Sequence, residues 1–236
     1  MEVEMKRTIL AALAASCLLA ACGCAEAEVP AGRVLEPIVG LPCEGCEVVF
    51  DGMPATLHSR VRIAPEGSAG QPMLIEGTVR DRQGRAASGI IVYAYHTDAR
   101  GLYPRDPTRT GPTAFRHGGL RNWVRTDEQG RYRFDTIRPS GYPDSDLPAH
   151  VHMHVIEPGR CTYYIDDIVF EDDPRLTAEK RQQSSRGRGG PGVVMPTRDE
   201  SGTWVVKRDI VLGERIPGYP EDPRPAATPD TPSDRH

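Results

Sequence analysis

The sequence has no stretch with a long amphipathic helical pattern, and this absence directs the fold prediction. The best helical candidate, residues 173–185, is short. The 236 residues include 24 Gly and 22 Pro, more than the average share, which favours turns over long helices. Hydrophobic residues make up 38% and charged residues 26%, a balance typical of globular proteins. We therefore expect a β-rich globular fold.

The sequence also lacks a basic stripe. Its 29 Lys and Arg and 33 Asp and Glu residues are scattered along the chain and give a net charge of −4. A nucleic-acid-binding surface needs clustered basic side chains to neutralise phosphates. We therefore expect no nucleic-acid partner.

The apolar run near the N-terminus, residues 9–21, is too short to span a membrane. It follows Lys6 and Arg7 and precedes small residues, which is typical of an export signal. Its end, Leu-Ala-Ala-Cys, resembles the lipobox of bacterial lipoproteins, in which the cysteine, here Cys22, becomes the lipidated first residue. Cleavage near Ala25 by an ordinary signal peptidase is the alternative. Both interpretations predict an exported, cell-envelope protein, and the first adds a lipid anchor in the periplasm or on the outer membrane.

The sequence has six cysteines but no second C-x-x-C motif that could complete a zinc site with Cys43 and Cys46. Disulfides form in the oxidising compartments to which exported proteins go, so a Cys43–Cys46 disulfide is favoured over half a zinc site. A catalytic redox pair would need a βαβ context, which the sequence does not show. Cys161 has no assigned partner.

Short runs of β-branched and aromatic residues, separated by turn residues, follow one another from Pro72 onward. Their close spacing predicts an all-β fold, an antiparallel sandwich or barrel, interrupted by long loops at residues 98–121 and 184–202. The expected strands are residues 73–81, 90–98, 123–127, 131–137, 150–159, 161–170 and 203–212.

Four segments follow from these patterns. We expect a lipoprotein signal peptide in residues 1–22, an N-terminal arm with the C-x-x-C motif in residues 23–71, a β-sandwich domain in residues 72–213 and a disordered Pro-rich tail in residues 214–236.

Three histidines, His150, His152 and His154, occupy alternate positions of an expected strand and therefore share one face. Neighbours are about 6.6 Å apart along the strand and the outer two about 13 Å apart. Metal–nitrogen bonds are only about 2.0–2.1 Å long, so one ion should not bind all three, and any ligating pair contains His152. Solvated histidines on a half-exposed strand are the alternative.

Two ligand sets could complete a metal site here. Glu157 with His150 and His152 would give an Fe(II) site of the kind found in cupins. Tyr103 and Tyr142, each in a loop constrained by Gly and Pro, would instead supply phenolates. Phenol has an ordinary pKa of about 10, so only a strongly Lewis-acidic centre such as Fe(III) would hold it deprotonated at neutral pH. Packing roles for both tyrosines remain the alternative.

Several segments together resemble the intradiol ring-cleavage dioxygenases, the family of catechol and protocatechuate dioxygenases. The resemblance lies within residues 72–213 and implies a mixed-topology β-sandwich with long active-site loops and little helix. It also implies a non-haem Fe(III) cofactor held by two tyrosines and two histidines. The segments that carry it are GTVRDRQGRAASGIIVYAYHTDARGLYP, TDEQGRYRFDTIRPSGYP, PAHVH, DDIVFEDDP and RDIVL.

Carried over to this sequence, the ligands are Tyr103, Tyr142, His150 and His152, and His154 falls outside the set. The resemblance implies that a catechol-type substrate chelates the iron, that Tyr142 leaves the metal and helps to remove a substrate proton, and that O₂ opens the ring to a muconate-type diacid. Homo-oligomerisation stays open, because the helical dimerisation segment of catechol dioxygenases is missing.

The sequence departs from the family pattern at two positions. Leu147 stands where characterised members carry an arginine, and Asp167 stands where a glutamine is expected. Arg105, Arg121 and Arg125 are the candidates to replace the missing arginine.

A binding module is the alternative to an enzyme. Residues 77–95 and 126–137 alone also match prealbumin-like β-sandwich modules, which have no reason to keep two tyrosines and two histidines together.

Overall fold

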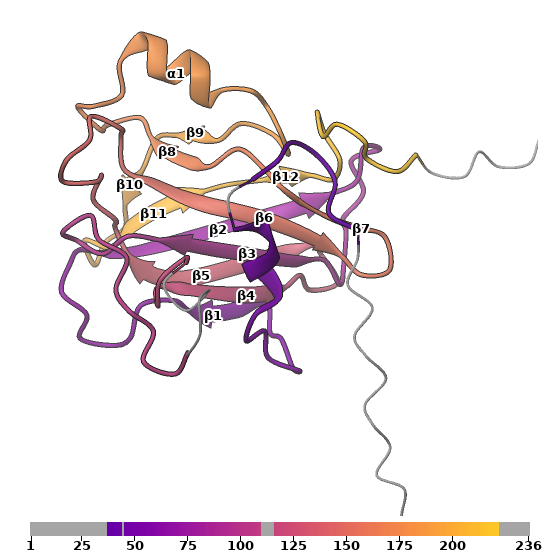
Figure 1. Ribbon diagram of the computed structural model, residues 1–236, viewed down its shortest axis with the longest axis horizontal. Coiled ribbons are helices and arrows are strands. Elements are labelled where there is room, and N and C mark those ends of the chain that lie inside the picture. The colour runs from indigo at the N-terminus through magenta and orange to yellow at the C-terminus, as the bar shows by residue number, and fades with distance from the viewer. Residues whose placement is uncertain (1–36, 44, 110–115, 222–236) are drawn as a thin grey trace, which may run out of the picture. The chain divides into compact units, whose positions relative to one another are not determined.

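The computed structural model describes residues 37–43, 45–109 and 116–221 (Figure 1). The expected signal peptide, the lipidation site at Cys22 and most of the Pro-rich tail lie outside the described residues. Within the described part of the chain, no helix is both long and apolar enough to cross a membrane.

Short strands form nearly all of the regular structure, as the sequence predicts, and the expected strand at residues 131–137 is found with the same bounds. The helix at residues 178–184 lies within the one helical candidate. The elements are η1 (Cys46–Phe50), β1 (Arg60–Arg62), β2 (Pro72–Arg80), β3 (Ile91–His96), β4 (Arg121–Arg125), β5 (Arg131–Ile137), β6 (His150–Glu157), β7 (Cys161–Tyr164), β8 (Ile168–Phe170), α1 (Ala178–Ser184), β9 (Val193–Val194), β10 (Thr197–Arg198), β11 (Trp204–Lys207) and β12 (Ile210–Val211).

The strands form two mixed sheets. The first sheet has the order β1-β5-β2-β11-β10, with β12 also paired to β2, and the second has the order β4-β3-β6-β8-β9, with β7 also paired to β6. Antiparallel pairs include β2 with β5 and β3 with β6. Parallel pairs join β1 to β5, β11 and β12 to β2, and β8 to β9. The predicted all-β sandwich of mixed topology is therefore confirmed.

The main core lies between the two sheets and is built by alternating residues. In β6 the odd positions Val151, Met153 and Val155 are fully buried, and they belong to one cluster with Ile75 of β2 and Phe134 of β5. Complete burial of each such side chain contributes about 1.5–3 kcal/mol. This burial fixes the register of β6, because a slip by one residue would turn its histidines into the core.

The outer face of the second sheet is covered as well. All residues of β3 are buried, because Val92 and Ala94 belong to the main core while Tyr93 and Tyr95 pack in a second cluster with Val49 of η1. Figure 1 shows η1 in front of β3 and β6. On the histidine face of β6, His154 is buried, whereas His150 and His152 are half-buried.

The segment expected to form a separate N-terminal arm is joined to the sandwich by hydrogen bonds. Its strand β1 pairs with β5, and Trp123 Nε1 donates a hydrogen bond of 2.7 Å to the carbonyl of Val49. The arm therefore takes part in building the surroundings of the histidine strand.

Candidate metal centre

Two loops bring Tyr103 and Tyr142 to the histidine strand. The loops touch at two glycines: Gly101 has φ +79°, and a Cβ there would collide with the carbonyl oxygen of Gly141. Ser140 ties them further, since its backbone N–H donates to the Asp98 carbonyl at 3.1 Å and its hydroxyl to the Ala99 carbonyl at 2.8 Å. Gly101, two residues before Tyr103, and Gly141, directly before Tyr142, are therefore needed for close packing of the two tyrosine loops.

The two tyrosines and the first two histidines of β6 meet with their polar atoms in a closed ring. The Tyr103 hydroxyl lies 2.9 Å from the Tyr142 hydroxyl, which lies 3.2 Å from His150 Nε2. His150 Nε2 lies 3.2 Å from His152 Nε2, and His152 Nε2 lies 3.0 Å from the Tyr103 hydroxyl. The structure therefore brings together the four residues that the sequence suggested as ligands.

The other ring nitrogen of each histidine is engaged away from this cluster. His150 Nδ1 lies 2.8 Å from the carbonyl of Pro148, and His152 Nδ1 lies 3.1 Å from the Asp167 carboxylate. A carbonyl and a carboxylate only accept hydrogen bonds, so Nδ1 is the protonated nitrogen and Nε2 carries the lone pair in each neutral ring. Both lone pairs are thereby directed at the cluster, as in metal sites whose histidines are oriented by outer hydrogen bonds.

The spacing of the four atoms fits one metal ion. Bonds of about 2.0–2.1 Å at angles of about 90–110° would separate two ligands of one ion by about 2.8–3.4 Å. The four separations of 2.9–3.2 Å fall in this range. Two phenol oxygens with two imidazole nitrogens form a donor set that suits a hard, strongly Lewis-acidic cation.

The electrostatics agree with a cation in this position. Burial raises the pKa of the Tyr103 phenol well above its ordinary value, and the hydrogen bond with Tyr142 acts in the same direction. Burial lowers the pKa of His150, and the neighbouring His152 lowers it further, which keeps the ring neutral. A cation among these groups would favour the phenolate forms that burial alone disfavours.

The third histidine and the glutamate of the strand lie elsewhere. His154 is buried on the same face but outside the ring of four atoms. Glu157 is buried with Tyr163 and Tyr219, whose hydroxyls donate to its carboxylate at 2.7 and 3.0 Å. The alternative Fe(II) set of His150, His152 and Glu157 is therefore wrong, because Glu157 has the opposite strand parity and points to the other face.

A cavity of about 470 Å³ opens onto this site. Tyr103, Tyr142 and His152 form part of its wall, together with Asp167. The lining is completed by Pro42, Cys43, Gly45, Tyr95, Arg116, His117, His154 and Tyr164.

None of the three candidate replacements for the family arginine contributes to this lining in the described part of the chain. Arg121 is buried and donates to the carbonyl of Asp51, and Arg125 donates to the carbonyl of Gly89. The arginine that does line the cavity is Arg116. Leu147 is 46% exposed and is not part of the cavity wall.

Three residues that support the site were not predicted from the sequence. Tyr95 stacks on His152 with ring centroids 4.5 Å apart and on His117 at 3.7 Å. Arg175 donates from Nη1 to the carbonyl of Tyr142 at 3.1 Å and so holds the second tyrosine loop. The alternation of β3 could have indicated Tyr95, whereas Arg175 and His117 come from irregular segments without a periodic signal.

A family model described as Dioxygenase (Dioxygenase_C) matches residues 49–189, which is more than half of the chain. The chain therefore belongs to this dioxygenase family, as its resemblance to the intradiol dioxygenases suggested. The match begins in η1, before the expected start of the sandwich at residue 72.

Among similar proteins, catechol 1,2-dioxygenase 1 of Acinetobacter lwoffii is 33% identical over 121 residues, which cover 43% of this chain and 37% of that protein. Chlorocatechol 1,2-dioxygenase of Pseudomonas putida is 28% identical over 162 residues, which cover 60% of this chain and 56% of that protein. The chain thus spans about one third to two thirds of the length of such curated relatives.

Solved structures show the same fold. Catechol 1,2-dioxygenase from Pseudomonas arvilla C-1 aligns with a TM-score of 0.53 at 22% identity, covering 74% of this chain and 60% of that one. The dioxygenase domain of a carbohydrate-binding fusion protein from Streptomyces sp. SirexAA-E aligns with a TM-score of 0.51 at 19% identity, covering 75% of this chain and 98% of that domain.

Proposed function

We propose that the protein is a non-haem Fe(III) intradiol dioxygenase that cleaves a catechol-type ring with O₂ to a muconate-type diacid. The observation that carries this proposal is the ring of four donor atoms from Tyr103, Tyr142, His150 and His152, with separations of 2.9–3.2 Å and both imidazole Nδ1 atoms engaged outside it. A module that only binds a ligand would have no use for this arrangement.

The four side chains would hold the iron. When bound, Fe(III) would supply a Lewis-acidic centre that stabilises the phenolates and binds the two oxygens of a catecholate, making its ring reactive toward O₂. Asp167 and Pro148 keep the two imidazoles in the tautomer that offers Nε2.

Tyr142 is the candidate base for the substrate. Its side chain lines the cavity, and as a phenolate its oxygen could accept a proton from a substrate hydroxyl. The cavity of about 470 Å³ is large enough for one substituted aromatic ring.

Oxygen consumption tests the activity. The iron-loaded protein, given a panel of catechol, chlorocatechol and hydroxyquinol, should consume one O₂ for each catechol ring cleaved and place both atoms of ¹⁸O₂ in a diacid product. Tyr142→Phe should slow turnover strongly, whereas Tyr219→Phe, a tyrosine bonded to Glu157, should not. Iron-loaded protein that consumes no O₂ with any of these rings, or that yields a ring-cleavage product of another type, would contradict the proposal.

We also propose that the protein is exported and anchored by a lipid at Cys22. Its support is the sequence alone: Lys6 and Arg7, the short apolar run after them and the Leu-Ala-Ala-Cys motif.

A further inference from the structure

The third histidine of β6 is not needed by the proposed iron site, yet its surroundings are specific. His154 is only 3% exposed and lines the cavity. Its Nδ1 is buried and has no hydrogen-bond partner among the described residues. A buried polar atom without a partner typically costs about 1–3 kcal/mol, so such an atom calls for an explanation such as a missing ion.

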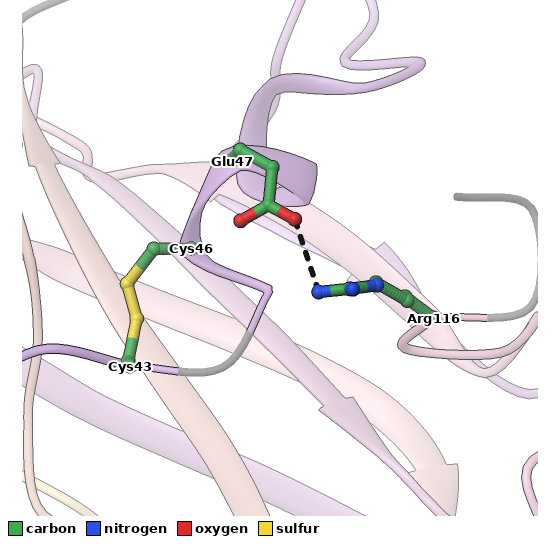
Figure 2. The surroundings of a disulfide bond; sticks show 4 residues. All are labelled: Cys43, Cys46, Glu47 and Arg116. Carbon is green, nitrogen blue, oxygen red and sulfur yellow. Dashed lines mark hydrogen bonds and ion pairs between the residues drawn. A yellow bond between two sulfur atoms is a disulfide. The ribbon is translucent and has the colours of Figure 1, made fainter. Parts of the chain in front are cut away.

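The neighbours of His154 are the two cysteines of the C-x-x-C motif. Cys43 and Cys46 form a disulfide with their Cα atoms 5.6 Å apart (Figure 2). One ring nitrogen of His154 and the two sulfur atoms all lie within 4.8 Å of one another. Cys43 belongs to the cavity wall, so a small reductant can reach the disulfide.

Reduction would change the chemistry of this group of atoms. Two thiolates and one neutral imidazole form a soft donor set, and C-x-x-C is a common half of zinc sites. Zinc bonds of about 2.3 Å to sulfur and 2.0–2.1 Å to nitrogen place tetrahedral ligands about 3.5–3.8 Å apart. The three atoms could therefore reach one ion by small shifts, and a fourth position would face the cavity.

Several bonds should keep the motif in place when the disulfide is open. Glu47 Oε1 accepts from Arg116 Nη1 at 3.1 Å, as Figure 2 shows beside the disulfide. Val48 N–H donates to the Gly45 carbonyl at 2.9 Å, and the Val49 carbonyl accepts from Trp123. None of these bonds involves a sulfur atom. They hold residues 45–49, so Cys46 would stay near His154, and Cys43 lies only three residues before Cys46.

We propose that Cys43, Cys46 and His154 form a second metal site, which binds a zinc-type divalent cation when the disulfide is reduced. A dithiol reductant transfers two electrons and two protons to the disulfide, giving two thiols and an oxidised, disulfide form of the reductant. Binding of the cation then displaces both thiol protons to solvent. Because Cys43 and His154 line the same cavity as the tyrosine and histidine cluster, the occupied site would narrow the space for the substrate ring.

Cobalt(II) is a suitable probe, because thiolates give it an intense ultraviolet charge-transfer band and a tetrahedral site gives it strong visible bands. The iron-loaded full-length protein is reduced with a dithiol, freed of reductant without air, and titrated with Co²⁺. We expect one equivalent of Co²⁺ to produce both features in the difference spectrum, excess Zn²⁺ to abolish them, and unreduced protein to show neither. Absence of the band after complete reduction would overturn the proposal.

Variants identify the ligands. Cys43→Ser with Cys46→Ser should abolish the thiolate band although the other cysteines remain. His154→Gln should weaken Co²⁺ binding at least about tenfold, whereas His58→Gln, at an exposed histidine, should leave it unchanged. Equal affinity of His154→Gln and wild type would refute the role of His154.

X-ray absorption at the zinc edge identifies the zinc ligands in reduced wild-type protein. This measurement does not depend on whether the His154→Gln variant folds. Two sulfur ligands and at least one imidazole are expected, and a zinc ion without an imidazole would contradict the site. The tyrosine and histidine cluster contains no sulfur, so this result does not depend on the proposed dioxygenase activity.

Discussion

The Asp167 carboxylate accepts a hydrogen bond from His152 Nδ1 over 3.1 Å and so orients the histidine that every ligand scheme requires. Burial disfavours the Asp167 carboxylate, but the electrostatic interaction and the hydrogen bond with the His152 ring outweigh burial, and the pKa of Asp167 lies below its ordinary value. Asp167 is therefore ionised at neutral pH and adds negative charge behind the ligand. It stands where the family pattern led us to expect a glutamine.

Removal of this carboxylate should weaken iron binding. Loss of an outer hydrogen bond to a ligating histidine typically costs about 10–100-fold in metal affinity, and we expect Asp167→Ala to fall in this range. Competition with an iron chelator measures the effect. Asp144→Ala, an exposed carboxylate two residues after Tyr142, serves as the control and should bind iron like the wild type. Equal affinities of both variants would show that Asp167 does not position His152.

Substitutions of the β6 histidines should differ in their effect on the iron content of the protein. His152 Nε2 contacts both the Tyr103 hydroxyl and His150 Nε2, so His152→Ala should lose most of the bound iron. His154 lies outside this ring, and His154→Gln should retain about one equivalent of iron in metal analysis of the purified protein. Iron lost with His154→Gln but kept with His152→Ala would reverse the ligand assignment.

Protonation of His96 should destabilise the protein in mild acid. His96 is buried between the Thr97 carbonyl and the Thr136 hydroxyl, each 2.7 Å from a ring nitrogen, and burial lowers its pKa from 6.5 to about 4. As the pH falls from 6.5 toward 4, the unfolded chain takes up this proton and the folded chain does not. The stability that neutral His96 contributes is thus complete above pH 6.5 and is lost toward pH 4.

Urea unfolding at pH 7 and pH 4.5 measures this contribution. The stability advantage of the wild type over His96→Gln should shrink by about 2 kcal/mol between the two pH values. The advantage over His58→Gln, an exposed histidine, should stay constant. An advantage over His96→Gln that does not change with pH would exclude this origin of acid sensitivity.

Much of the fold could be predicted from the sequence, because strands with strict alternation and glycine turns carry a local signal. The strand at residues 131–137 and the histidine strand are such cases. The short strands β9 and β10 could not be found, since two residues hold no periodicity. The burial of Val49, which belongs to the arm, also depends on packing against Trp123, 74 residues away.

Only part of the candidate site could be predicted from the sequence, because only some of its residues lie in local motifs. The two tyrosines, His150 and His152 belong to motifs, and the structure brings all four together. Arg116 and Cys43 reach the cavity from separate irregular segments, so their approach depends on tertiary packing that no local pattern encodes.

The proposed anchor can be tested separately from the site. When the gene is expressed in a bacterium, wild-type protein should partition with membranes and Cys22→Ser should not mature to the lipidated form. Membrane fractionation with mass spectrometry of the N-terminus provides the measurement. Equal recovery of both proteins in the soluble periplasm would refute lipidation.

The visible spectrum of the iron-loaded protein tests the central claim most directly. Tyrosinates on Fe(III) absorb visible light by charge transfer, so the protein should be reddish, and both Tyr103→Phe and Tyr142→Phe should alter the band while Tyr219→Phe should not. A binding module or an Fe(II) site would lack this colour. A colourless protein that binds iron, or a band unchanged in both Tyr103→Phe and Tyr142→Phe, would contradict the assignment of Tyr103, Tyr142, His150 and His152 as ligands.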